Sequence, residues 1–141
     1  MEIKKMKYTK DQQEVVEMTD KDCIFCKIAG GNIPSSTVYE DEQFRVILDL
    51  SPATKGHALI LPKQHYANIF EIDEHVLKDL IVLAKKVATA VKETLNCDGV
   101  NIVQNNGEVA GQTVFHFHMH IIPRYKDDGQ VIGWEPHTSD P

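Results

Sequence analysis

Most of this chain consists of short apolar runs separated by turn residues, and one longer segment repeats its apolar positions with the period of a helix. The short runs are rich in Val, Ile, Leu and Phe and are bounded by Gly, Pro, Asp and Asn, a pattern typical of strands. They predict five strands, at residues 37–40, 43–50, 57–62, 100–105 and 114–122. The first two strands are joined closely enough to predict a hairpin.

The helical segment extends from Glu74 to about Leu95, with Asp73 placed to cap its first turn. Its apolar positions recur at intervals of three and four residues, through Leu77, Leu80, Ala84, Val87 and Val91. A second, short helix is predicted over Cys23–Ala29, ended by two glycines. Because the strands do not alternate with helices, we expect an α+β domain whose antiparallel sheet is covered on one face by the long helix.

Length, charge and cysteine count restrict the classes to which the protein can belong. The 141 residues are enough for one domain, which we assign to 21–141 with an irregular tail, after a charged arm over 1–20. The net charge of −6 argues against nucleic-acid binding. The apolar runs are too short to span a membrane, and no signal peptide is recognisable. Three cysteines, an odd number, disfavour a secreted disulfide framework, so we expect a cytoplasmic protein.

Three of the seven histidines, His116, His118 and His120, fall at every second position of the segment "VFHFHMHIIPR". Alternate residues of a strand share a face, so the three imidazoles point one way and the apolar residues between them point toward the core. Each ring adds a polar group to desolvate, so a purely structural role is disfavoured. Such a row can bind a metal, or it can bind and attack a phosphoryl group.

The preceding segment, "GEVAGQT", favours the phosphoryl alternative. Its glycines allow the backbone to approach an anion, and its amides, carboxamide and hydroxyl can all hydrogen-bond phosphate oxygens. A simple metal site has no need of these groups. The row of histidines and this segment together predict an anion-binding catalytic site.

The motif "HFHMHII" resembles the signature of the histidine triad superfamily. The segments "CIFCKI", "YEDEQFRVILDLSPATKGHALILPKQH" and "NNGEVAGQTVFHFHMHIIPR" resemble its nucleotide-binding branch in the bacterial form, so the similarity covers roughly residues 22–135. The resemblance implies a five-stranded antiparallel sheet with one long helix and a short N-terminal helix. It also implies a homodimer, in which two sheets join edge to edge.

The resemblance further implies catalytic roles for individual residues. His118 matches the nucleophile that attacks the α-phosphorus of a nucleotide, and His120 matches a residue that contacts the phosphate. His57 matches a fourth histidine that helps to orient the nucleophile. The hydroxyl of Thr113, where many relatives have Ser, would hydrogen-bond the scissile region.

Nucleotide-binding roles are implied in the same way. Asp49 matches the residue that binds the ribose hydroxyls, and Leu50 matches a neighbouring apolar contact with the nucleoside. The phosphate-binding positions implied by the family pattern are Asn105, Gly111, Gln112, Thr113, His118 and His120.

The pair Cys23 and Cys26 has the C-x-x-C spacing, which fits a redox motif, half of a zinc site or two packed thiols. A redox motif of the thioredoxin type requires a βαβ context, which the pattern does not predict. The resemblance implies a structural zinc whose other two ligands are His65 and His116. Cys97 has no such partner and is interpreted as structural.

These features lead to a functional hypothesis. We expect a hydrolase that cleaves purine nucleoside 5′-phosphoramidates through a nucleotidyl-histidine intermediate, without a catalytic metal or an organic cofactor. Diadenosine polyphosphate hydrolysis is the alternative within the same class, and a regulatory adaptor with incidental hydrolysis is the alternative outside it. A metal-dependent oxygenase receives no support from the sequence, since no 2-His-1-carboxylate set stands out.

Overall fold

The computed structural model describes residues 20–139, so the expected N-terminal arm, apart from Asp20, lies outside the described residues. The elements follow in the order α1 (Ile24–Ala29), β1 (Thr37–Glu40), β2 (Phe44–Leu48), β3 (Ala58–Pro62), α2 (Glu74–Leu95), β4 (Gly99–Val103), the 3-10 helix η1 (Glu108–Ala110) and β5 (Met119–Arg124). Within residues 20–139, no helix is both long and apolar enough to cross a membrane.

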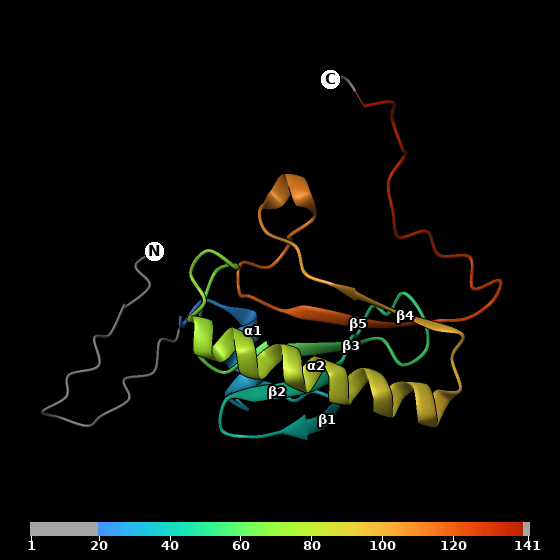
Figure 1. Ribbon diagram of the computed structural model, residues 1–141. Coiled ribbons are helices and arrows are strands. Elements are labelled where there is room, and N and C mark those ends of the chain that lie inside the picture. The colour runs from blue at the N-terminus through green and yellow to red at the C-terminus, as the bar shows by residue number, and fades with distance from the viewer. Residues whose placement is uncertain (1–19, 140–141) are drawn as a thin grey trace, which may run out of the picture.

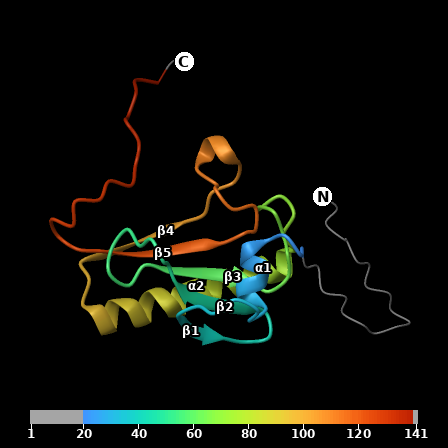
Figure 2. The ribbon, with the colours of Figure 1, turned by 180° about the vertical axis from the view of Figure 1, so that it is seen from behind.

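The strands form one antiparallel sheet in the order β1-β2-β3-β5-β4. Helix α2 lies across one face of this sheet, and α1 lies against the other (Figures 1 and 2). The β1–β2 turn is fixed by Asp41, whose carboxylate accepts the backbone N–H groups of Gln43 and Phe44, each at 2.8 Å. The α+β class and the antiparallel sheet predicted from the sequence are confirmed.

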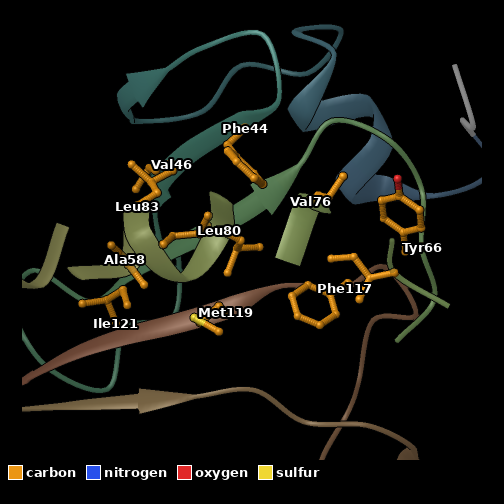
Figure 3. Close-up of a cluster of buried hydrophobic side chains, with 13 residues drawn as sticks. Phe44, Val46, Ala58, Tyr66, Val76, Leu80, Leu83, Phe117, Met119 and Ile121 are labelled. Carbon is orange, nitrogen blue, oxygen red and sulfur yellow. The ribbon is translucent and has the colours of Figure 1, made fainter. Parts of the chain in front are cut away.

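The central strands are buried on both faces of the sheet. Ala58 and Ile60 of β3 point toward α2, whereas Leu59 and Leu61 join a second cluster beneath α1. The larger cluster contains Leu80 of α2, and Figure 3 shows the α2 side chains meeting those of β2, β3 and β5. The continuous apolar run of β3 is therefore explained by burial between two helices.

Helix α2 has the predicted bounds and Asp73 is its N-cap residue as predicted, but the expected side-chain cap is not made. Asp73 has extended dihedrals, φ −63° and ψ 139°, and makes no side-chain capping bond. Its carboxylate instead accepts the hydroxyl of Tyr66 at 3.4 Å, which joins the start of the helix to the preceding loop. At the other end, Asn96 adopts the left-handed conformation and its N–H bonds to Lys92.

The last strand was predicted over residues 114–122, and this prediction is wrong at both ends, because β5 begins at Met119 and ends at Arg124. Before Met119 the chain is bonded to the loop after β3, with the N–H of Phe117 donating to the carbonyl of Tyr66 at 2.6 Å. The strand continues through Pro123 because pairing with β3 ends at Ile121. Proline has no backbone N–H to donate. Pro123 is tolerated because β3 no longer pairs with β5 at that position.

Candidate active site and metal centre

The alternation of the three histidines is retained although only His120 lies in β5. Phe117 and Met119 point into the core beneath α2 (Figure 3). His116 and His118 contact residues of α1, on the opposite side of the sheet. The ring centroids of His118 and His120 are 5.1 Å apart. His116 and His118 are buried, and His120 is half-buried. The predicted shared face is therefore present without the predicted strand.

The tautomer of His118 is determined by a single backbone contact. Its Nδ1 lies 2.7 Å from the carbonyl oxygen of His116, and a carbonyl only accepts, so Nδ1 carries the proton. The lone pair is consequently on Nε2, the nitrogen that points away from the chain. Burial lowers the pKa of His118, which keeps the ring neutral and nucleophilic near pH 7.

His57 and His120 form a hydrogen-bonded pair with a fixed direction. The N–H of Ala53 donates to Nδ1 of His57 at 2.9 Å, so that nitrogen has no proton. The proton of His57 is therefore on Nε2, which lies 2.9 Å from Nδ1 of His120. His120 in turn carries its own proton on Nε2. Burial, and then the charges of His118 and His57, lower the pKa of His120 to about 4.

These contacts place His57 beside His120 and not against His118. Any orienting effect of His57 on the expected nucleophile therefore passes through His120. Burial lowers the pKa of His57, although the carboxylate of Asp49, 3.6 Å from its Nε2, acts in the opposite direction. The two adjacent imidazoles at the site thus offer opposite functions: a lone pair on His118 and an N–H donor on His120.

Asp49 and Leu50 directly follow β2 and begin the loop that leads to His57. The N–H of Asp49 donates to the carbonyl of His57 at 2.9 Å, and its Oδ1 accepts the N–H of Ser51 at 2.9 Å. The side chain of Leu50 is 89% exposed, so it is available for contact with a ligand. The predicted ribose-binding residue Asp49 is thus adjacent to His57, and Leu50 follows it in the chain with an exposed side chain.

Asp49, His57 and His120 also form a 2-His-1-carboxylate set, which the sequence did not show, with candidate ligand atoms within 4.8 Å of one another. A neutral histidine that binds a metal through Nε2 must carry its proton on Nδ1. In His57 that position faces the N–H of Ala53, so the two protons would collide. The backbone therefore favours a hydrogen-bonded pair over a metal site.

The expected phosphate-binding residues other than His120 lie in the loop between β4 and β5, which contains η1. Gly111 has φ of +100°, and a Cβ there would lie 3.3 Å from Nδ2 of Asn105, so the position favours glycine twice over. Thr113 is exposed. Gln112 differs from its neighbours because it is only 2% exposed.

All hydrogen-bonding groups of the Gln112 carboxamide are used within the chain. Its Oε1 accepts the N–H of Gly107 at 2.8 Å, and its Nε2 donates to the carbonyls of Ala67 and Val114 at 2.6 and 3.1 Å. The side chain joins both ends of the β4–β5 loop to the loop after β3. The backbone N–H of Gln112 is also used, since it donates to the carbonyl of Gly107 at 3.0 Å. Gln112 therefore stabilises the shape of the loop and does not present a free donor to a phosphate.

The predicted zinc ligands come together in a separate cluster. The ligand atoms of Cys23, Cys26, His65 and His116 lie within 4.8 Å of one another. Cys26 Sγ lies 3.2 Å from Nδ1 of His65 and 3.3 Å from Nδ1 of His116, and Cys23 Sγ lies 3.4 Å from the latter. A tetrahedral zinc site with ordinary bond lengths separates sulfur and nitrogen by about 3.5 Å. The donor set and its spacing fit zinc.

The surroundings of the cluster also favour a metal. Nε2 of His116 lies 2.8 Å from the carbonyl of Pro62, so it carries the proton and leaves the Nδ1 lone pair facing the thiols. A hydrogen bond from Cys26 lowers the pKa of Cys23, and the same bond raises that of Cys26. The pair therefore retains one proton between two sulfurs, and a bound cation would displace it.

Known proteins resemble this chain in sequence and in fold. Residues 30–127 match the HIT domain family. The chain belongs to the histidine triad (HIT) family. It is 48% identical over 121 residues to "Protein hit" of Bacillus subtilis, an alignment that covers 85% of this chain and 83% of that protein. It is 41% identical over 122 residues to the Saccharomyces cerevisiae protein named adenosine 5′-monophosphoramidase HNT1, covering 86% of this chain and 75% of the yeast protein. A solved Zn-bound histidine triad family protein from Mycobacterium smegmatis superposes with a TM-score of 0.75 at 38% identity, covering 82% of this chain and 84% of that one.

Two groups in this HIT domain were missed by the sequence analysis. The N–H of Ala53 determines the tautomer of His57, but a backbone donor leaves no signal in the residue type. The ring of Phe25, from α1, meets the ring of His118 edge to face, with centroids 4.9 Å apart and planes at 83°. The position of Phe25 between the two cysteines is the one signal that could have placed it here, since a metal there would bring α1 against the histidines.

Proposed function

We propose that this protein hydrolyses purine nucleoside 5′-phosphoramidates through a covalent intermediate on His118. The observation that carries the proposal is the bond between His118 Nδ1 and the carbonyl of His116, which leaves a neutral Nε2 lone pair beside the N–H donor of His120. A nucleophile next to an anion-stabilising donor is the arrangement that phosphoryl transfer requires. The name of the yeast relative, adenosine 5′-monophosphoramidase, supports the same substrate class.

In the first step, Nε2 of His118 attacks the α-phosphorus and the phosphorus–nitrogen bond breaks. The amine leaves with a proton taken from solvent, and the nucleotide remains bonded to His118. The Nε2–H group of His120 donates to a phosphate oxygen, and the hydroxyl of Thr113 contacts the scissile region. In the second step, water attacks the phosphorus, the bond to His118 breaks, and the nucleoside monophosphate is released.

The remaining residues bind the nucleotide. Asp49 accepts hydrogen bonds from the ribose hydroxyls, and Leu50 packs on the base or sugar. Asn105 and the backbone of the β4–β5 loop bind the phosphate, with Gly111 and Gln112 holding that loop in place.

We assign the cluster of Cys23, Cys26, His65 and His116 to a structural zinc, which would join α1 to the segment before β5. The zinc supplies folding free energy when bound, and four protein ligands leave no position for a substrate. The Zn-bound relative from Mycobacterium smegmatis supports this assignment.

We also assign a homodimer, formed through the edge strand β4 and the adjacent face of α2. Ile102 of β4 is 47% exposed and Ile81 of α2 is 50% exposed, and both line one groove. β4 pairs with β5 on one side, and on its other side a second copy would satisfy the free backbone groups.

A hydrolysis panel tests the proposed activity. Adenosine and guanosine 5′-phosphoramidates are compared with dinucleoside polyphosphates, and the intermediate is trapped by alkaline denaturing quench, which preserves a phosphorus–nitrogen bond, and intact mass spectrometry. We expect phosphoramidates to be cleaved fastest, with one nucleotide added to the peptide that contains His118. Faster cleavage of dinucleoside polyphosphates would instead favour the alternative substrate, and nucleotide binding without any turnover would favour an adaptor.

A further inference from the structure

The end of β5 and the segment that follows it are bonded to three consecutive residues of the β2–β3 loop. The carbonyl of Pro123 accepts the hydroxyl of Thr54, and the hydroxyl of Tyr125 donates to the carbonyl of Lys55 at 2.8 Å. The carboxamide Nε2 of Gln130 donates to the carbonyl of Ala53 at 2.9 Å. Figures 1 and 2 both place this loop beside the end of β5, where the C-terminal segment begins.

The position of Gln130 is itself fixed by a turn over residues 124–130. Asp128 accepts hydrogen bonds from Nε and Nη2 of Arg124 at 2.8 and 3.0 Å, and from the N–H of Gln130 at 2.9 Å. Nη2 of Arg124 also donates to the carbonyl of Gln130 at 2.7 Å. Nη1 of Arg124 donates to Asn101 of β4 at 2.9 Å, which fastens the turn to the sheet.

Ala53 is therefore bonded at both ends of its backbone. Its carbonyl accepts from Gln130, and its N–H donates to Nδ1 of His57. That N–H determines which nitrogen of His57 is protonated, and so determines which nitrogen of His120 is protonated. A change in the orientation of Ala53 would leave His57 free to adopt the other tautomer.

We propose that Gln130 is a positioning residue for the His57–His120 pair, acting through the backbone of Ala53. The kinetic part of this inference rests on the function proposed above. Gln130 touches no substrate. It holds the N–H of Ala53 in the direction that makes His57 a donor to His120, and thereby directs the Nε2–H of His120 toward the phosphate.

The β2–β3 loop is also held at Gly56. One further bond, from Gln130, is therefore enough to fix the orientation of Ala53. Gly56 has φ of +89°, and a Cβ there would lie 2.2 Å from Cδ1 of Leu95. The loop is thus packed against the end of α2 on one side, and the turn after β5 holds it on the other. Gln130 is exposed, so its substitution leaves the core unchanged.

The experiment compares Gln130→Met, which keeps the length of the side chain and removes the donor, with Gln130→Lys, which restores a donor. A second pair compares Asp128→Asn, which weakens the turn, with Asp127→Asn, the same charge change one residue away on an exposed side chain. Phosphoramidate turnover is measured together with ¹⁵N–¹H spectra of the histidine rings, which report the tautomer of His57 with no substrate present.

We expect Gln130→Met and Asp128→Asn to lower kcat about fivefold, the effect of one neutral hydrogen bond, with KM unchanged. The same two variants should lose the single tautomer of His57, and Gln130→Lys and Asp127→Asn should retain it. Ring spectra of Gln130→Met identical to those of the unmodified protein would overturn the inference. If the unmodified protein fails to cleave phosphoramidates, the proposed function fails, and the ring spectra alone still decide the role of Gln130.

Discussion

The Nδ1 nitrogen of His118 lies 2.7 Å from the carbonyl oxygen of His116, two residues earlier in the chain. This bond leaves Nε2 of His118 as a free lone pair, so removal of the ring should stop the reaction at its first step. We expect His118→Ala and His118→Asn to reduce phosphoramidate turnover by at least about a thousandfold while nucleotide binding is retained. Steady-state kinetics and calorimetric titration with AMP measure the two effects. His75→Asn, at an exposed position of α2, is the matched control. Near-normal turnover in folded His118→Ala would exclude the covalent mechanism.

The stability of the protein should fall in mild acid. His57, His118 and His120 all have a lowered pKa, chiefly because they are buried. In the unfolded chain a histidine titrates near about 6.5, so below that pH the unfolded state binds more protons than the folded state. The free energy of unfolding is therefore highest above about pH 6.5 and decreases as the pH falls toward about 4.

Urea unfolding at pH 7.5 and pH 5 measures this decrease. His120→Gln removes the group with the lowest pKa of the three, and its stability should depend less on pH than that of the unmodified protein. An equal loss in both proteins would mean that His120 does not contribute.

Zinc should be bound at one ion per chain. Cys23→Ser and Cys26→Ser each remove a thiolate ligand, so we expect loss of the ion and a large decrease in the melting temperature, with a smaller effect on kcat. Cys97→Ser is the control, because Cys97 lies outside the cluster. Elemental analysis and thermal unfolding with and without a chelator give the result. Protein purified without chelator that contains no zinc would refute the metal assignment.

Gly111→Ala should weaken nucleotide binding. The residue has φ of +100°, and the added Cβ would lie 3.3 Å from the side chain of Asn105. We expect KM to rise and the free energy of unfolding to fall by about 1–2 kcal/mol. Gly133→Ala is the matched control, since a Cβ there meets nothing within 4 Å. Equal KM values for the two variants would show that the shape of the loop does not matter for binding.

Ile102→Lys should disrupt the proposed dimer, because it places a charge in the groove between β4 and α2. Sedimentation equilibrium should give twice 15.9 kDa for the unmodified protein and 15.9 kDa for the variant. Phe70→Lys, at an exposed residue away from this groove, should remain dimeric. A monomeric unmodified protein at micromolar concentration would end the proposal.

The fold was largely predictable because its elements have strong periodic patterns. The repeat from Leu77 to Val91 predicted α2 with its observed bounds. The predicted start of β5 was wrong because an alternating pattern indicates only which side each residue faces. It does not indicate whether a neighbouring strand pairs with that segment. His116 and His118 alternate correctly, although the N–H of Phe117 between them bonds to Tyr66 in a loop and not to a strand.

The candidate site was predictable only in part. The resemblance to the histidine triad pattern indicated His57 and His65, because neither has a local pattern that distinguishes it from a surface histidine. The convergence of His65 with Cys26 depends on how the loop after Pro62 folds back. The role of Ala53 could not be predicted, since every residue except proline has the same N–H group.

His116 contributes to two different sites through different parts of the same residue. Its side chain faces the thiols, and its carbonyl oxygen holds the ring of His118. The carbonyl is present whatever side chain stands at position 116. A lineage could therefore replace the four proposed metal ligands with apolar residues that pack equally well and still hold the ring of His118 in the same orientation. On the proposed assignment, the zinc site is the part of this protein that evolution can discard independently.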